Sequence, residues 1–321
     1  MRRTEKTWMI IAAFAVLLGM LIFGGVMTVL KWDFTKLSTG KYETTTYEID
    51  EIYQDISIVT NTADIVFLPS ENGKTEVVCY DQTNMRHEVS VADGEMVIEV
   101  ADVREWYEYI GIHFKTPKIT VYMPHGEYNT LWINSDTGDV EIPKDFKFKD
   151  ITIEEDTGDV TNHASATGCI KIKTDTGNIC VENMSAGALD LSVSTGKVTV
   201  SEISCAGDVK IHVSTGKTLL TDVQCQNVIS SGSTGAISLE NVIATGKFSI
   251  ERSTGDVKFA RADAAEIFVE TDTGDITGTL LSEKIFLPRS STGHIDVPKT
   301  VTGGRCEIST DTGNIKISVS N

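Results

Sequence analysis

The sequence predicts an all-β fold: a parallel β-solenoid built from 19–20-residue coils of two strands each, preceded by a single transmembrane helix. Three observations predict it. A Thr-Gly pair recurs ten times at intervals of 19 or 20 residues. Apolar and polar residues alternate after these pairs, and one long apolar run lies near the amino terminus. The glycines of the repeated pairs are Gly138, Gly158, Gly177, Gly196, Gly216, Gly235, Gly255, Gly274, Gly293 and Gly313.

The apolar run covers residues 9–30 and contains no charged residue. At ~1.5 Å per helical residue it spans about 33 Å, enough to cross a hydrocarbon core of roughly 30 Å. Trp8 and Trp32 flank it, where indole rings prefer the headgroup level. A cleaved signal, the alternative, has an apolar core of only ~7–15 residues and a small-residue cleavage site. We therefore expect a retained transmembrane helix over residues 9–31.

The expected orientation places a short tail, residues 1–8, in the cytoplasm and the rest of the chain outside. Basic side chains are nearly balanced on the two sides of the span, so the positive-inside rule does not decide. The short tail and the large acidic domain favour an amino terminus inside. We expect a single-pass protein of the cell membrane with an extracytoplasmic C-terminal domain.

The domain after the helix is strongly acidic. The chain has 46 Asp and Glu against 28 Lys and Arg, a formal net charge of −18. Phosphate binding needs a basic surface, so nucleic acid is excluded as a partner.

The repeat predicts strands because its apolar residues have a period of two. Positions two and four after the repeated glycine are apolar, as in Val140 and Ile142 or Val198 and Val200, with a polar residue between them. A unit of 20 residues cannot bury its own apolar face, whereas stacked coils bury it against each other. The Asp or Ser that stands two residues before each glycine fits a turn with positive φ at that glycine. We expect the regular solenoid over 131–321.

Two further segments precede the regular repeat. Residues 32–46, rich in Thr and Lys, predict a stalk between membrane and rod. Residues 47–130 alternate like strands but repeat poorly, which predicts irregular first coils and a cap. The sequence ends at Ile317–Asn321 within a coil, which predicts an uncapped solenoid end there.

Cys205 and Cys225 each lie nine residues after a repeat glycine, so stacked coils place them about one strand spacing apart. That distance is at the short end of what a disulfide permits. The alternative, which we favour, is two stacked free thiols that act as small buried hydrophobic groups. The six cysteines show no Cys-x-x-Cys spacing, which argues against zinc.

Five aspartates fall in equivalent rows of successive predicted coils. Stacking places like charges about 5 Å apart, which a structural Ca²⁺ ion with oxygen ligands would relieve. We favour the alternative, a solvated ladder of turn residues, because the nine-residue repeat of calcium-binding solenoids is absent. No other metal or cofactor is expected. The calcium candidates are Asp136, Asp139, Asp156, Asp159 and Asp175.

The densest aromatic cluster outside the apolar run lies around residues 105–110. We expect it to cover the first coil. The alternative is a recognition loop for a glycan or a protein, because exposed Trp and Tyr side chains anchor interfaces. The ligand-binding candidates are Trp106, Tyr107, Tyr109 and Phe114.

The sequence predicts no enzyme. Catalysis needs unlike neighbouring groups with separated pKa values. Here the aspartates belong to the repeat and the six histidines are scattered. No Gly-x-Ser-x-Gly motif and no phosphate-binding glycine-rich loop occurs.

Three features together resemble the bacterial "putative adhesin" β-strand-repeat family, whose members carry a domain of unknown function. They are residues 62–65 (Thr-Ala-Asp-Ile) followed by Pro69, the run 119–124 leading into the Asp-Thr-Gly-Asp of 136–139, and the Thr-Gly ladder itself. The resemblance covers about residues 47–321. It implies a cell-envelope β-solenoid, often behind one membrane span, without catalytic residues. Six cysteines are unusual for such a domain.

We therefore expect a membrane-tethered, extracytoplasmic β-solenoid that binds an extracellular glycan or protein, in an adhesin-like or envelope-surveillance role. The first alternative is a structural polymer in which solenoids join end to end through the C-terminal solenoid end. The second is a β-helix enzyme that acts on polysaccharides.

Overall fold

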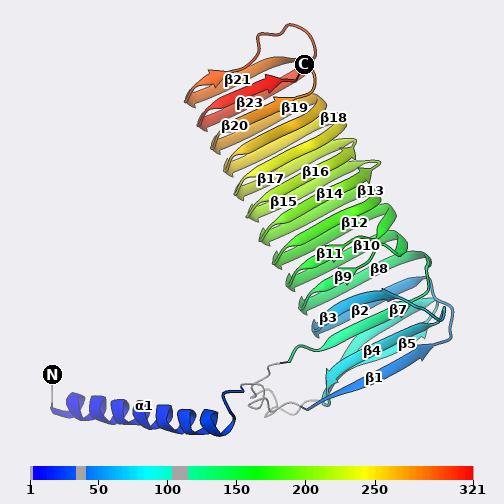
Figure 1. Ribbon diagram of the computed structural model, residues 1–321, viewed down its shortest axis with the longest axis vertical. Helices are drawn as coiled ribbons and strands as arrows, with labels where there is room; N and C mark the ends of the chain where they lie inside the picture. The colour runs from blue at the N-terminus through cyan, green and yellow to red at the C-terminus, as the bar shows by residue number, and fades with distance from the viewer. Residues whose placement is uncertain (1–2, 34–40, 103–114, 321) are drawn as a thin grey trace.

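The structure, a computed structural model, describes residues 3–33, 41–102 and 115–320, with the backbone alone over residues 3–7. It is an elongated β-solenoid with one helix at its amino-terminal side (Figure 1). This confirms the predicted fold class. The helix α1 (Arg3–Val29) contains a segment, Trp8–Val29, that is long and apolar enough to cross a membrane.

Seven strands form the amino-terminal end of the rod. They include one complete coil, β2 followed by β3, and five strands that lie outside it. The strands are β1 (Tyr42–Ile49), β2 (Asp55–Thr62), β3 (Asp64–Pro69), β4 (Thr75–Gln82), β5 (Met85–Ala92), β6 (Glu95–Asp102) and β7 (Lys118–Met123).

The remaining strands form stacked coils, in which each coil contributes one segment to each of two parallel walls. The strands are β8 (Gly126–Thr137), β9 (Val140–Ile142), β10 (Phe146–Thr157), β11 (Val160–Asn162), β12 (Ser165–Thr176), β13 (Ile179–Thr195), β14 (Val198–Cys205), β15 (Asp208–Thr215), β16 (Thr218–Cys225), β17 (Asn227–Thr234), β18 (Ile237–Thr254), β19 (Val257–Thr273), β20 (Ile276–Leu280), β21 (Lys284–Thr292), β22 (Ile295–Asp296), β23 (Gly304–Thr312) and β24 (Ile315–Val319).

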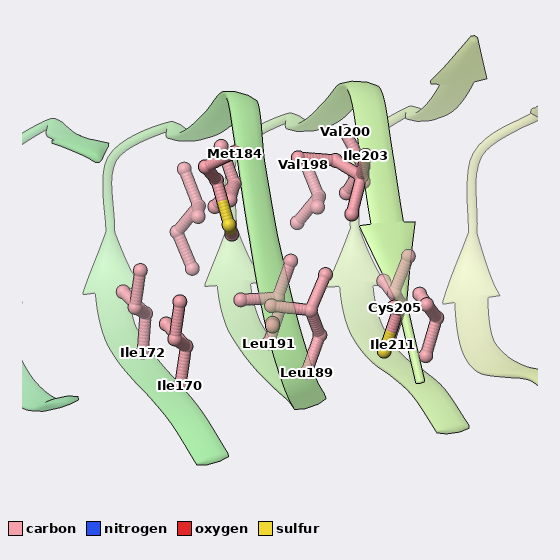
Figure 2. Close-up of a cluster of buried hydrophobic side chains, with 14 of the residues drawn as sticks. Ile170, Ile172, Met184, Leu189, Leu191, Val198, Val200, Ile203, Cys205 and Ile211 are labelled. Atoms are coloured by element: carbon pink, nitrogen blue, oxygen red, sulfur yellow. The ribbon is translucent and has the colours of Figure 1, made fainter. Parts of the chain in front are cut away.

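The core lies between the two walls and consists of in-register apolar ladders. In one wall Leu191 pairs with Ile172 on one side and Ile211 on the other. In the opposite wall Val200 pairs with Val181 and Leu220. Figure 2 shows side chains of both walls, such as Leu191 and Val200, in the space between them. Because every coil repeats the same inward positions, each buries its apolar face against its neighbours, as the period of two predicts.

The repeated glycine sits at the corner where one wall turns into the other. Gly158 has a φ of 159°, and a Cβ there would lie 1.7 Å from the carbonyl oxygen of Gly138 in the preceding coil. Its N–H donates to the carbonyl of Thr176 in the following coil at 3.0 Å. Backbone therefore stacks directly on backbone at this corner, which explains why the residue must be glycine.

A second corner uses left-handed residues that carry side chains. These residues recur every 19 or 20 positions with φ between 52° and 56°, a conformation that Asn and Asp tolerate best. They are Asn183, Glu202, Asp222, Asn241 and Arg261. These residues recur at a regular interval in the sequence, but our prediction did not include left-handed residues at this second corner.

At the amino-terminal end, the order of coils differs from the order of the sequence. The coil β2–β3 lies directly beside β8–β9, while β6 and β7 lie on its outer side. Beyond them the pairing becomes antiparallel, β1 with β4, β4 with β7 and β5 with β6. Residues 42–46, which we assigned to the stalk, belong to β1 and pair with β4.

The carboxy-terminal end also departs from sequence order, and here the prediction was wrong. Strand β23 pairs with β19 on one side and β21 on the other, and β24 pairs with β20 and β22. The coil that contains Ile317 is therefore inserted between two earlier coils, and Ile317 is buried. The outermost coil of the rod is β21–β22 (Figure 1).

The insertion depends on a Gly-Gly pair at the start of β23. A Cβ on Gly303 would lie 1.8 Å from the carbonyl oxygen of Glu283, and one on Gly304 would lie 1.7 Å from that of Ala265. The returning chain thus passes between two backbone segments that leave no room for a side chain.

Candidate binding surfaces

The carboxy-terminal end of the rod exposes large apolar side chains. We call residues 281–305 the tip segment. Among the described residues from position 41 onward, eight large hydrophobic side chains are exposed, and five belong to this segment: Leu281, Ile285, Leu287, Ile295 and Val301. Val301 is 88% exposed. Large apolar side chains that are exposed together on a folded domain are candidates for an interaction surface.

The hollow beside the tip segment continues this surface. It is lined by Ile243 and Leu281 together with the polar corner residues Asp222, Asn241 and Arg261. The Arg261 Nε donates to Asn241 Oδ1 at 2.8 Å, and Asn241 Nδ2 donates to Asp222 Oδ1 at 2.8 Å. The polar side chains of this hollow thus hydrogen-bond to one another. Ile243 and Leu281 are therefore the side chains of the hollow that are free to contact a partner.

The aspartate row after the repeated glycine bonds to backbone. Asp139 Oδ1 accepts the N–H of Asp159 at 2.9 Å, and Asp159 Oδ1 accepts the N–H of Asn178 at 2.7 Å. The outer row of Asp136, Asp156 and Asp175 is exposed. Over the described ranges, no group of three or more His, Cys, Asp or Glu side chains is arranged to hold a metal ion. The turn ladder that we favoured accounts for these residues. The alternative, a structural Ca²⁺ ion, stays a prediction.

The two cysteines of the small-residue row, Cys205 and Cys225, are buried free thiols in the structure. Burial raises the pKa of Cys225 to about 12 and also raises that of Cys205. A thiol with a raised pKa is a poor nucleophile. Both side chains therefore act as small buried hydrophobic groups, and their redox state in the cell stays a prediction.

The aromatic candidates Trp106, Tyr107, Tyr109 and Phe114 lie outside the described residues. Their predicted role as a recognition loop or a cover for the first coil remains a prediction.

One arrangement that the sequence did not reveal joins the cap to the first coil. The Thr60 Oγ1 lies 2.7 Å from His87 Nε2, and His87 Nδ1 lies 2.7 Å from Asp81 Oδ1. The backbone N–H of His87 donates to the other oxygen of Asp81 at 2.8 Å. No recognisable motif connects these three residues in the sequence, so only the fold brings them together.

The order hydroxyl, imidazole, carboxylate is that of a nucleophilic triad, but the position of these groups excludes that chemistry here. Each of the three residues is at most 2% exposed. A substrate must bring its reacting atom within hydrogen-bond reach of the nucleophile, and Thr60 has no surface to offer. The network instead fastens the antiparallel strands β4 and β5 to the coil strand β2.

Two charged residues occupy the row three positions before the repeated glycine, where the other coils have Ser, Thr, Val or Gly. Glu155 is 3% exposed and neither carboxyl oxygen has a hydrogen-bond partner among the described residues. Burial, followed by the charge of Asp139, raises the pKa of Glu155 to about 8. The carboxyl group is therefore mostly protonated at neutral pH, which avoids a buried charge.

Arg252 occupies the same row in a later coil and is also buried. Its Nη2 donates to Ser230 Oγ at 2.8 Å and to Thr218 Oγ1 at 3.2 Å. Burial lowers its pKa to about 10. A Cβ on Gly232 would lie 2.5 Å from Arg252 Nη1, so the neighbouring coil leaves room for the guanidinium. Glu155 and Arg252 lie inside the rod and offer nothing to a ligand.

The model of the family described as Toastrack DUF4097 matches residues 53–213 and 206–321. The chain belongs to the Toastrack DUF4097 family. The two matches together cover residues 53–321 of this Toastrack chain, which include the solenoid and the cap strands other than β1. None of the curated proteins matches it significantly.

Solved structures of similar proteins align with most of this chain. A "putative adhesin" from Parabacteroides distasonis is 12% identical, with 87% of this chain and 98% of that one covered and a TM-score of 0.47. A "putative adhesin" from Bacteroides fragilis is 15% identical, covering 87% and 97%, with a TM-score of 0.40. A "putative lipid binding protein" from Parabacteroides distasonis is 16% identical, covering 75% and 95%, with a TM-score of 0.47. None of these similarities is close enough to transfer a function to this Toastrack chain.

Proposed function

We propose that this Toastrack protein is a non-enzymatic, adhesin-like binding module, tethered by α1 to the cell membrane and extending outside the cytoplasm. The observation that carries the proposal is the contrast between the two ends of the rod. The amino-terminal end connects to the apolar helix, and the opposite end exposes the apolar tip segment. A rod of this kind holds a contact surface at a distance from the membrane.

The reach of the rod follows from strand spacing. One wall contains ten parallel steps from β2 to β21 through β8, β10, β12, β13, β15, β17, β18, β19 and β23. At ~4.8 Å per step these coils span about 48 Å. The side walls are acidic and regular, which favours solubility, whereas the tip segment departs from the repeat.

End-to-end polymerisation, our first alternative, is not supported by this arrangement. Joining rods head to tail needs a solenoid coil exposed at both ends. The amino-terminal end presents antiparallel strands instead. A polysaccharide-acting site is likewise unsupported, because the only buried hydroxyl–imidazole–carboxylate network among the described residues has no access to solvent.

The test is the accessibility of the domain on intact cells. A cysteine introduced by Ser291→Cys at the exposed end of β21 should react with a membrane-impermeant maleimide without lysis. The native thiols give a low background, because burial raises the pKa of all six cysteines, as for Cys306 to about 12. Labelling only after lysis would overturn the extracytoplasmic placement.

A further inference from the structure

The start of strand β1 must lie close to the membrane if α1 spans it as proposed above. The helix ends at Val29, and Trp32, which is 59% exposed, follows it where indole rings prefer the headgroup level. Nine peptide links connect Asp33 to Tyr42, the first residue of β1, and they reach at most about 32 Å. The chain therefore keeps the surface around Tyr42 within reach of lipid headgroups.

The ends of three antiparallel strands meet at this surface. Tyr42 lies opposite Gln82 near the end of β4. Tyr80 in β4 lies opposite Lys118 at the start of β7. Because side chains two residues apart share one face of a sheet, Tyr42, Tyr80 and Lys118 all lie on its outward face. We call the following residues the basal patch: Lys41, Tyr42, Tyr80, Lys115 and Lys118.

The aromatic part of the basal patch is held in place by its own contacts. The rings of Tyr42 and Tyr80 stack with their centroids 5.3 Å apart. The Lys115 Nζ lies 5.6 Å from each ring centroid and donates to the Tyr80 hydroxyl at 2.8 Å. The Tyr42 hydroxyl donates to the carbonyl of Lys115 at 2.8 Å. A surface that is ordered before contact loses little entropy on binding, and tyrosine and lysine are side chains that favour the membrane interface.

The lysines of the basal patch are not neutralised by the part of the chain that the structure describes. None of the ion pairs among the described residues includes Lys41, Lys115 or Lys118. Asp64, which is paired with Lys118 in the neighbouring strand, accepts the N–H of Asp139 at 3.1 Å. Three ammonium groups are thus available to phosphate oxygens, with which they form charge-assisted hydrogen bonds.

The rest of the domain carries the opposite charge. At the far end of the same sheet face, Glu48 in β1 lies opposite Glu76 in β4. Residues 41–280 as a whole carry a net charge of −22. An anionic membrane therefore attracts the basal patch and repels both the far end of this sheet and the walls of the rod. The distribution of charge selects the part of the domain that meets the membrane.

We propose that the basal patch docks on the anionic phospholipid headgroups of the membrane that holds α1. The three lysines contact phosphate oxygens, and the two tyrosine rings lie at the headgroup level. The inference rests on the proposed tethering by α1 and adds a second contact to it. The helix holds the chain in the membrane, and the basal patch fixes the base of the rod against the surface with the acidic walls directed away.

The test uses the full-length chain in vesicles of phosphatidylcholine, with or without phosphatidylglycerol, that carry the same share of a lipid with a nitroxide on its headgroup. A fluorophore on Asn84→Cys reports contact, because the preceding Thr83 donates its N–H to the carbonyl of Lys41 at 2.9 Å. Its quenching should be at least threefold stronger in the anionic vesicles. About 1 M salt, where the Debye length is ~3 Å, should remove the difference. A fluorophore on Ser291→Cys in the tip segment should stay unquenched in both.

The lysines are tested together in the Asn84→Cys background. Gln at positions 41, 115 and 118 should reduce the quenching to its level in neutral vesicles, and Arg at the same three positions should retain it. The matched control removes the same charge from three exposed lysines outside the basal patch and should leave the quenching unchanged. It carries Lys144→Gln, Lys147→Gln and Lys149→Gln.

Two results would overturn the docking while leaving the tether intact. They are equal quenching of the Asn84→Cys probe in neutral and anionic vesicles, and an equal loss in the two Gln variants. Flotation of the vesicles after an alkaline carbonate wash reports the insertion of α1 separately. A chain that the wash removes would overturn the proposed tether and the docking with it, whereas a retained chain with an unquenched probe would overturn the docking alone.

Discussion

The terminal coils at the two ends of the rod are covered in different ways. At both ends a later segment of the chain returns between or beside earlier coils, β8–β9 beside β2–β3 and β23–β24 beside β19–β20. At the amino-terminal end, antiparallel strands and a buried polar network cover the last coil. At the carboxy-terminal end, no described strand covers the last coil, but the loop after β22 contacts it, with Thr300 Oγ1 donating to the carbonyl of Lys284. A repeat that can extend indefinitely must be terminated. Antiparallel strands do so at one end, and a loop and Pro288 within the edge strand β21 do so at the other.

The largest expected effect is a loss of stability with rising pH, caused by Glu155 in a coil near the covered amino-terminal end. The pKa of Glu155 is about 8 in the folded protein, against 4.5 for an ordinary Glu, so the folded state binds the proton more tightly. The contribution of Glu155 to the free energy of unfolding is then complete below about pH 4.5. It is lost as the pH rises to 8, by up to about 5 kcal/mol at ~1.4 kcal/mol per pH unit. Glu155→Gln should abolish this fall, as measured by urea unfolding between pH 4 and 9.

The control for this experiment is Glu154→Gln, which changes the neighbouring outward residue. Glu154 accepts a bond from Lys171 Nζ at 2.7 Å at the surface, and its side chain is 40% exposed. Its replacement should preserve the pH dependence of the unmodified protein. Parallel pH profiles for the unmodified protein and Glu155→Gln would contradict the buried, protonated carboxyl group.

The next largest effect tests the covered end itself. Asp81→Ala leaves the N–H groups of a fully buried His87 without their acceptor, and such a loss costs about 3–4 kcal/mol. The free energy of unfolding, from urea denaturation, should fall by that amount. Asp50→Ala, at a carboxylate that is 79% exposed and 3.4 Å from Lys74 Nζ, should change it by less than about 0.5 kcal/mol. Equal effects would mean that the cap is not fastened through this network.

A third comparison tests the insertion at the open end. Ile317 in the inserted coil is 5% exposed, whereas Ile295 in the outermost coil is 37% exposed. Ile317→Ala should cost about 2–3 kcal/mol and Ile295→Ala about 1 kcal/mol or less. Ile295→Ala would cost more than Ile317→Ala if the coil containing Ile317 were the true end of the rod.

The smallest expected effect compares the two ends with the same probe. Cys79 lies in the cap and Cys306 in the inserted coil, both are at most 1% exposed, and burial raises both pKa values to about 12. Labelling of either thiol requires local opening. Because a single thinly packed coil covers Cys306, we expect it to react about tenfold faster than Cys79 in a peptide-resolved mass-spectrometric assay. Equal rates would mean that the two ends open equally.

The periodic part of this structure could be predicted from sequence, because a row such as Ile172, Leu191 and Ile211 reflects one physical requirement repeated in every coil. The order of the coils could not. The coils share the Thr-Gly corner and the alternation of inward and outward positions, so exchanging β23–β24 with β21–β22 preserves that pattern. The Gly303-Gly304 pair is a local signal that distinguishes the two orders.

The candidate surfaces were harder to predict than the fold. The apolar side chains of the tip segment look like ordinary strand residues in the sequence, and their exposure follows from the position of β21 at the end of the stack. The contact between Thr60, Asp81 and His87 likewise depends on the fold of the cap. The aspartate row was predictable, since its positions follow the repeat, and its bonds to backbone explain it without a ligand.

The insertion of β23–β24 also constrains how the protein is made. Synthesis proceeds from the amino terminus, so β21–β22 emerges before the coil on which it finally rests. Until β23–β24 follows, the nascent outermost coil must wait undocked or rest on β19–β20 and later be displaced. The rod can therefore grow coil by coil during translation everywhere except at its tip, where completion must follow synthesis of the inserted segment.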